Sequence, residues 1–196
     1  MTLETGLDAC CTAIARFTDI SSLTIDFQYP VVLDGLPEVP PVFMGALEPI
    51  LQLQRLTRLD IQILYLHLDD TAIASMAAAF PHIRHLRLEF SRDSNVTFLG
   101  LIPLATQCPE LEMLILSELL VVEQEVPPPS TVSSGSKLHF FEVNNNPPAT
   151  KEFIEMVLSR YFPLLPEITM CYARGGSRAV GGYRNGNAPK TVSVLM

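Results

Sequence analysis

An apolar triplet that recurs along the chain constrains the fold more than any other feature. The triplet has the form apolar-x-x-apolar-x-apolar, and its six copies begin at Ile20, Leu56, Ile83, Leu111, Leu138 and Leu165. Successive copies are 36, 27, 28, 27 and 27 residues apart. Four nearly equal spacings in a row indicate an internal structural repeat, so each copy is expected to occupy the same place in a repeating unit.

Each triplet is predicted to form a short strand with one buried face. Side chains alternate along a strand, so the last two apolar residues of a triplet point to one side and their neighbours to the other. The next strand must start in parallel after a return path of about 20 residues, which is usually long enough to contain a helix. The pattern is typical of an α/β leucine-rich-repeat solenoid, an arc of about six repeats of 27–28 residues with parallel strands inside and helices or loops outside.

Helical spacing of apolar residues between the triplets predicts the return paths. An N-terminal capping helix is expected over residues 3–16, where it would cover the open end of the first strand. Further helices are expected over residues 43–55, from Asp69 to Phe80, from Thr97 to Cys108 and near residues 150–161. Aspartate and threonine are good N-caps, and Pro81, Pro109 and Pro163 disfavour continuation of the last three of these helices.

Two proline-rich loops and a C-terminal tail depart from the repeat. Residues 28–41 contain four prolines and account for the single long spacing. Residues 123–137, rich in proline and serine, are expected to form an irregular loop in place of a helix. The repeats are therefore expected to form one domain over residues 1–173, followed by a flexible glycine-rich, basic tail over residues 174–196.

The net charge of −8 argues against a nucleic-acid or membrane partner. The tail carries four basic residues and no acid, so the remaining 173 residues carry −12. Cys10, Cys11, Cys108 and Cys171 have neither a metal-ligand spacing nor an evident disulfide pattern. Reduced thiols in an intracellular protein, in the cytoplasm or nucleus, are expected from this pattern.

Two segments, Val96–Leu119 and Lys137–Ile168, resemble the leucine-rich-repeat region of F-box proteins, especially those of fungi. The resemblance implies a repeat domain that holds a substrate, while a separate F-box binds the adaptor of a ubiquitin ligase. The chain shows no F-box motif, because Leu36-Pro37-Glu38 is followed by Val39 and two prolines. The adaptor is therefore expected as a partner only if an F-box exists outside this chain.

Alternation also predicts which residues face a partner on the concave, strand-lined side. The candidate partner-binding residues are Met113, Ile115, Phe140, Arg58, His85, Arg87 and Glu142. Three of them are neighbouring apolar residues, which is typical of a protein interaction site. The basic ones would suit an acidic partner segment. Stacking at about 4.8 Å predicts Asp60 beside Arg87 and Arg58 beside His85. Alternatively, the tail, the loop over residues 123–137 or a further domain would cover these apolar residues in place of a partner.

The sequence contains no strong signal for catalysis, a cofactor or a metal. His82 and His85 are three apart, so on a strand they face opposite sides and converge poorly on one ion. Phosphate-binding and nucleophile motifs are absent from the sequence. The favoured function is a protein–protein interaction module, the substrate-recognition arm of an F-box ubiquitin ligase. The alternatives are a truncated structural repeat fragment without independent activity and, less favoured, an enzyme.

Overall fold

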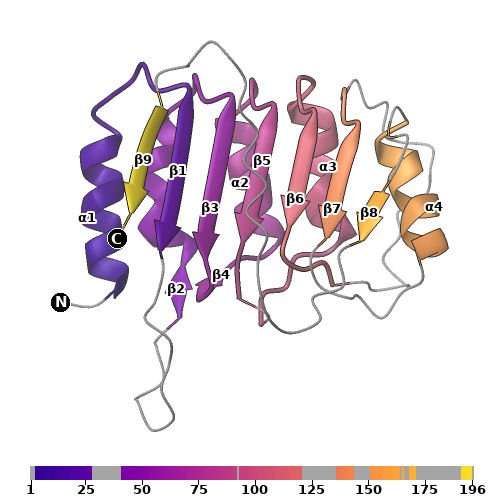
Figure 1. The fold of residues 1–196 in the computed structure, drawn as a ribbon, viewed down its shortest axis with the longest axis horizontal. Helices are drawn as coiled ribbons and strands as arrows, with labels where there is room; N and C mark the ends of the chain where they lie inside the picture. The colour runs from indigo at the N-terminus through magenta and orange to yellow at the C-terminus, as the bar shows by residue number, and fades with distance from the viewer. Residues whose placement is uncertain are drawn as a thin grey trace, which may run out of the picture.

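The computed structural model describes residues 3–27, 41–91, 93–120, 136–143, 151–163, 165, 168–170 and 191–195. Its main sheet has seven strands in the order β8-β7-β6-β5-β3-β1-β9, and all neighbours are parallel. The strands are β1 (Ser22–Phe27), β3 (Arg58–Ile63), β5 (His85–Glu89), β6 (Met113–Leu116), β7 (Phe140–Val143), β8 (Ile168–Met170) and β9 (Thr191–Leu195). Figure 1 shows them in one layer, with the helices behind it on a single face.

The six repeated triplets lie on six neighbouring strands in one common register. Their middle residues pair in the order Leu23, Leu59, Leu86, Leu114, Phe141 and Ile168. The predicted parallel stacking of these positions is confirmed. The predicted α/β class with a parallel sheet is likewise confirmed.

Burial follows the alternation of side chains along each strand. On the five strands whose side chains are described, the residues that pack against the helices are almost fully buried: Leu23, Ile25, Leu59, Ile61, Ile63, Leu86, Leu88, Leu114, Leu116, Phe141 and Val143. They belong to one continuous core cluster that runs from Leu7 in the first helix to Phe162 after the last. The opposite face, called the open face below, carries the remaining strand side chains.

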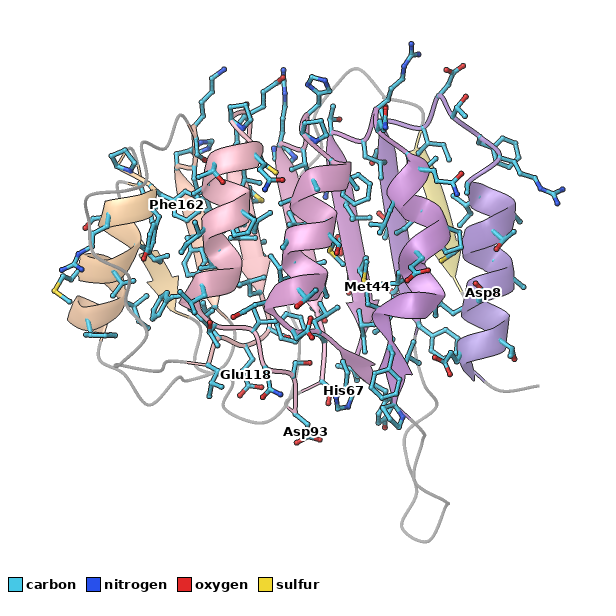
Figure 2. All side chains as sticks on the ribbon, turned by 180° about the vertical axis from the view of Figure 1, so that it is seen from behind. Asp8, Met44, His67, Asp93, Glu118 and Phe162 are labelled. Atoms are coloured by element: carbon cyan, nitrogen blue, oxygen red, sulfur yellow. The ribbon has the colours of Figure 1, made fainter. Side chains whose placement is uncertain are left out.

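The helical elements form one layer over the buried face of the sheet (Figure 2). They are α1 (Leu3–Ile14), the 3-10 helix η1 (Met44–Gln52), α2 (Asp70–Ala79), α3 (Phe98–Gln107) and α4 (Lys151–Tyr161). The predicted caps are in place: Asp69 Oδ1 accepts a hydrogen bond from the Ala72 amide at 2.8 Å, and Thr97 Oγ1 accepts one from the Leu99 amide at 3.1 Å. The segment expected as a helix over residues 43–55 is a 3-10 helix that contains Pro49, which cannot donate an amide hydrogen bond.

The turn from helix to strand is built the same way in successive repeats. After α2 the Ile83 amide donates to the Phe80 carbonyl, and after α3 the Leu111 amide donates to the Cys108 carbonyl, both at 3.1 Å. The chain then enters β3, β5, β6 and β7 with a bond to the preceding repeat, as when the Glu112 amide donates to the Arg84 carbonyl at 2.8 Å. Because the same bonds recur from repeat to repeat, the sequence period is also a structural period.

A second, minor ladder runs along the edge of the molecule where the strands end. Its regular part is the parallel pair β2 (Val42–Phe43) and β4 (Leu66–His67). The isolated bridges Asp69 to Asn95 and Thr97 to Leu120 continue it. His67, Asp93 and Glu118 mark this edge in Figure 2. The sequence does not predict this ladder, since its strands of two residues are too short to show alternation.

The two ends of the sheet differ from the sequence prediction. Thr191–Leu195, expected to belong to a flexible tail, forms β9 and pairs with the outer edge of β1. The flexible-tail prediction is wrong for these five residues, because Thr-Val-Ser-Val-Leu alternates and is rich in β-branched residues. Consequently α1 does not cover the edge of β1 as expected, and it packs instead against η1. The edge strand β8 lies at the opposite end.

Other predictions lie largely outside the described residues. Of the proline-rich loop over residues 28–41 only Pro41 is described, and of the loop over residues 123–137 only Ser136 and Lys137. Within the described part of the chain, no helix has the length and apolar character needed to cross a bilayer.

Candidate functional site

The open face of the sheet presents the residues that alternation assigned to it. Arg58 pairs in register with His85, His85 with Met113 and Met113 with Phe140. In the next row Asp60 pairs with Arg87, Arg87 with Ile115 and Ile115 with Glu142. The predicted neighbours Asp60 and Arg87, and Arg58 and His85, are therefore confirmed. A register shift by one residue, which would have swapped the two faces, is excluded by the burial of Leu86 and Leu114.

Three neighbouring apolar side chains form the centre of the candidate site. Met113 and Ile115 lie on β6 and Phe140 on β7, and all three are partly exposed. They are called the apolar patch below. Parallel pairing puts Phe140 directly beside Met113, whereas Ile115 lies one pleat further along. Partly exposed apolar side chains on neighbouring strand positions offer a partner a surface that releases water when it is covered.

Arg87 is held by two carboxylates on the open face. Its Nη2 donates to Glu89 Oε1 at 2.6 Å, and its Nε lies 3.9 Å from Asp60 Oδ1. Both acids are buried, with exposed fractions of 7% for Asp60 and 3% for Glu89. Gln62 adds a hydrogen bond from its amide nitrogen to Asp60 at 3.0 Å. A buried charge that loses its partner is strongly destabilising, so this cluster primarily fixes the sheet surface.

The expectation that Arg87 binds an acidic partner segment therefore needs revision. Its charge is already matched by Glu89 and Asp60, so a partner carboxylate would have to displace a short internal bond. The contact of Arg87 with Glu89 was not among the predictions. The signal was present, because Glu89 follows Arg87 by two residues on the same strand and such residues share a face.

His85 contributes little positive charge near neutral pH. Burial lowers the pKa of the imidazole from its ordinary value of 6.5, and the nearby Arg58 guanidinium lowers the pKa further. The Glu112 carboxylate, whose Oε2 lies 3.7 Å from His85 Nε2, raises the pKa of the imidazole, but the net shift of the pKa is still downward. The imidazole is thus mainly neutral at pH 7. Of the three basic residues proposed for the site, Arg58 alone is exposed and has no carboxylate partner in the described part of the chain.

The histidine pair considered for metal binding is engaged with two different carboxylates. His82 Nδ1 lies 3.2 Å from Glu110 Oε1, and the same carboxylate accepts two hydrogen bonds from Arg84 at 3.0 and 2.8 Å. His85 faces Glu112 instead. Among the described residues no three His, Cys, Asp or Glu side chains gather as a metal site would require.

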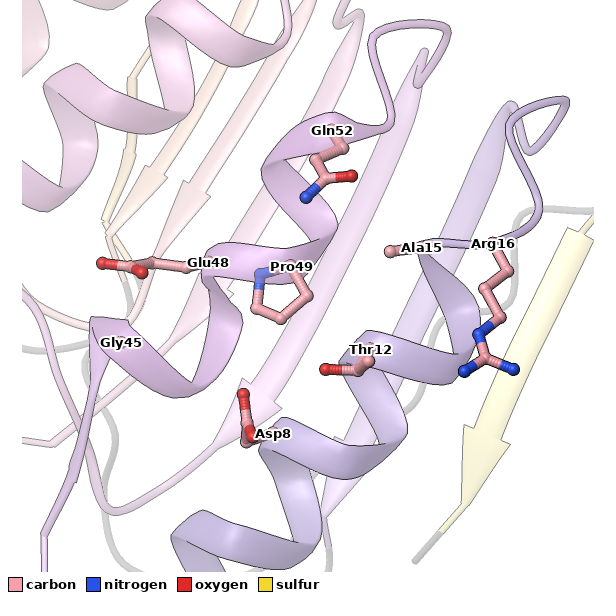
Figure 3. Close-up of a pocket in the computed structure, with 8 residues that line it drawn as sticks. All are labelled: Asp8, Thr12, Ala15, Arg16, Gly45, Glu48, Pro49 and Gln52. Atoms are coloured by element: carbon pink, nitrogen blue, oxygen red, sulfur yellow. The ribbon is translucent and has the colours of Figure 1, made fainter.

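A separate groove lies in the helix layer, between α1 and η1. Its volume is about 590 Å³, and its lining includes Asp8, Arg16 and Glu48. Figure 3 shows Asp8 directed into the groove, Glu48 pointing away from α1, and Arg16 on the side toward β9. An enzyme site needs titratable groups that converge on one reacting atom, and these three do not converge.

Comparison with known proteins adds no assignment. No protein-family model matches the sequence, and no curated protein resembles it at a significant level.

Proposed function

We propose that the chain is a leucine-rich-repeat solenoid that binds another protein through the open face of its sheet. The observation that carries the proposal is the apolar patch. Met113, Ile115 and Phe140 come from two neighbouring strands, remain partly exposed and share a face with few other apolar side chains. The recurring turn and the single register support the repeat architecture, since each repeat contacts mainly its neighbours.

The biological role that we propose is that of a substrate-recognition arm for an F-box ubiquitin ligase. This rests on the resemblance of Val96–Leu119 and Lys137–Ile168 to the repeats of such proteins. The ligase adaptor would be a partner only through an F-box encoded outside this chain. Sequencing the transcript upstream of the codon for Met1 tests this role, and a complete upstream region without an F-box would contradict it.

The binding function is tested by removing the patch without disturbing the core. We expect a variant with Met113→Ser, Ile115→Ser and Phe140→Ser to lose the proteins that the wild type retains in a quantitative pull-down. The three side chains lie on the face opposite the buried leucines, so the variant should keep the circular dichroism spectrum of the wild type.

A matched control removes as much apolar surface elsewhere. Phe17, Phe43 and Met156 are 63%, 54% and 45% exposed and lie outside the main sheet, after α1, in β2 and in α4. Serine at these three positions should leave the retained proteins unchanged. Capture by the folded patch variant equal to that by the wild type would contradict binding through the patch. A wild type that retains no protein specifically would favour the alternative, a structural repeat unit without a partner of its own.

A further inference from the structure

Most charged side chains of the open face are matched within the sheet itself. Arg87 is held by Glu89 and Asp60, and His85, which is mainly neutral at pH 7, offers a partner little charge. Charges that are already paired within the sheet attract a charged partner only weakly, because a new ion pair would have to break an existing one. Specificity for a charged partner must therefore come from side chains that are not already matched.

Arg58 and Glu142 are the charged residues of this kind among the described residues of the open face. Neither has a side chain of opposite charge within ion-pair distance in the described part of the chain. Arg58 is exposed at the start of β3, and Glu142 is partly exposed on β7. The two residues have charges of opposite sign. β5 and β6 lie between their strands, so Met113 and Ile115 of the apolar patch lie between Arg58 and Glu142.

Glu142 also has an aromatic neighbour that suits a cation. It shares a strand face with Phe140, two residues earlier, and pairs in register with Ile115. A guanidinium or ammonium group placed here would meet the carboxylate on one side and the ring of Phe140 on the other. An anion in the same place would meet repulsion and an apolar surface.

The strand geometry sets the separation of the two charges. From β3 to β7 there are three strand spacings of about 4.8 Å each, and Glu142 lies two residues further along its strand than the partner of Arg58, or about 6.6 Å. The two Cα positions are therefore about 16 Å apart. An extended chain advances about 3.3 Å per residue, so this distance corresponds to roughly five residues of a bound peptide.

We propose that the open face binds an extended peptide segment that carries a basic and an acidic residue about five positions apart, with apolar side chains between them. The basic residue lies against Glu142 and Phe140, the acidic residue lies against Arg58, and the apolar ones cover Met113 and Ile115. This inference rests on the proposed function and defines the chemistry of its partner. The opposite signs at the two ends also fix the direction in which the peptide lies.

The test uses a displayed library of random linear peptides, selected on the full chain. We expect the selected peptides to share the basic, apolar and acidic pattern and to bind the patch variant at least about tenfold more weakly. Glu142→Lys should weaken binding by about tenfold, and replacing the peptide's basic residue with glutamate should recover most of that loss. Arg58→Glu should be rescued in the same way by a basic residue at the other end.

Two controls separate this inference from general charge effects and from the proposed function. Glu48→Lys and Arg16→Glu make the same changes of charge in the helix layer, outside the open face, and should leave peptide binding unaltered. Peptides that depend on the apolar patch but bind Glu142→Lys and Arg58→Glu as tightly as the wild type would overturn this inference alone. A selection that yields no patch-dependent peptide would overturn the proposed function together with it.

Discussion

At the scale of single residues, one aspartate joins two consecutive repeats. Asp70 begins α2, and its carboxylate accepts hydrogen bonds from the Thr97 amide at 2.7 Å and from the Thr97 hydroxyl at 2.6 Å. Thr97 in turn caps α3. The start of one helix therefore holds the start of the next, and this link needs a close approach of α3 to Asp70.

Gly100 permits that close approach. A Cβ at this position would lie 2.5 Å from Asp70 Oδ1 and 3.2 Å from the Asp70 Cα. Gly100→Ala should therefore lower the free energy of unfolding by about 2 kcal/mol, even though alanine favours a helix over glycine by up to about 1 kcal/mol. Urea denaturation followed by circular dichroism measures the change.

Gly45 supplies the control, because a Cβ there would meet nothing within 4 Å. Gly45→Ala should be neutral or slightly stabilising in the same assay. If Gly100→Ala were as stable as the wild type, Asp70 would have to move aside at little cost in free energy. The proposed tight link between the two repeats would then be wrong.

At the scale of elements, β9 and β8 are the two edge strands of the main sheet, and β9 covers the edge that β1 would otherwise present. β9 pairs along its whole length with β1, so that Val192 lies beside Leu23 and Val194 beside Ile25 in the strand register. A paired edge resists the addition of foreign strands, whereas an unpaired one invites it. The C-terminal strand thus protects the first repeat although it is the last element of the chain.

Ending the chain after Lys190 should expose β1 selectively. We expect amide hydrogen exchange in Leu23–Ile25 to accelerate strongly, because the backbone bonds between β1 and β9 are lost. Exchange in β6 and β7 should change little, since three strands, β1, β3 and β5, lie between β9 and β6, and β7 is one strand further away. Mass spectrometry of proteolytic fragments reports both regions, and uniform acceleration across the sheet would contradict a local role for β9.

At the scale of the whole molecule, a single apolar core connects the first helix to the last. Cys11 in α1 and Cys108 at the end of α3 are both fully buried in it. The pKa of each thiol is raised to about 12, mainly by burial, and for Cys11 the neighbouring Cys10 contributes to that rise. Since the thiolate is the reactive form, both cysteines should resist alkylation near pH 8 while the chain is folded.

These two thiols can report whether the chain unfolds as one unit. In a Cys10→Ser, Cys171→Ser background, we expect Cys11 and Cys108 to become reactive toward iodoacetamide at the same urea concentration, because one core holds both. Labelled fragments are quantified by mass spectrometry. Distinct midpoints for the two cysteines would show that the regions around α1 and α3 unfold independently, as parts of some repeat proteins do.

The repeating elements could be predicted because their causes are local. The triplets predict the register of Leu59 against Leu86, since side-chain alternation and a constant return path leave one stacking that buries both. The helix ends could be predicted as well, because they depend on residues close in sequence: the N-caps Asp69 and Thr97, and Cys108 before Pro109 at the end of α3. The apolar patch follows from the same alternation.

The remaining features depend on contacts between residues far apart in the chain. Thr191–Leu195 could have paired with either edge of the sheet, and its position beside β1 depends on which edge the fold leaves open. Alternation put Asp60 and Glu89 on the same face as Arg87, but only the tertiary structure showed that both carboxylates are buried and that Glu89 accepts a hydrogen bond from the guanidinium. The sequence alone thus determined the period and the two faces of the sheet. The tertiary structure decided which strands form the edges of the sheet and which charged side chains stay available to a partner. Those outcomes depend on distances that a linear pattern does not contain.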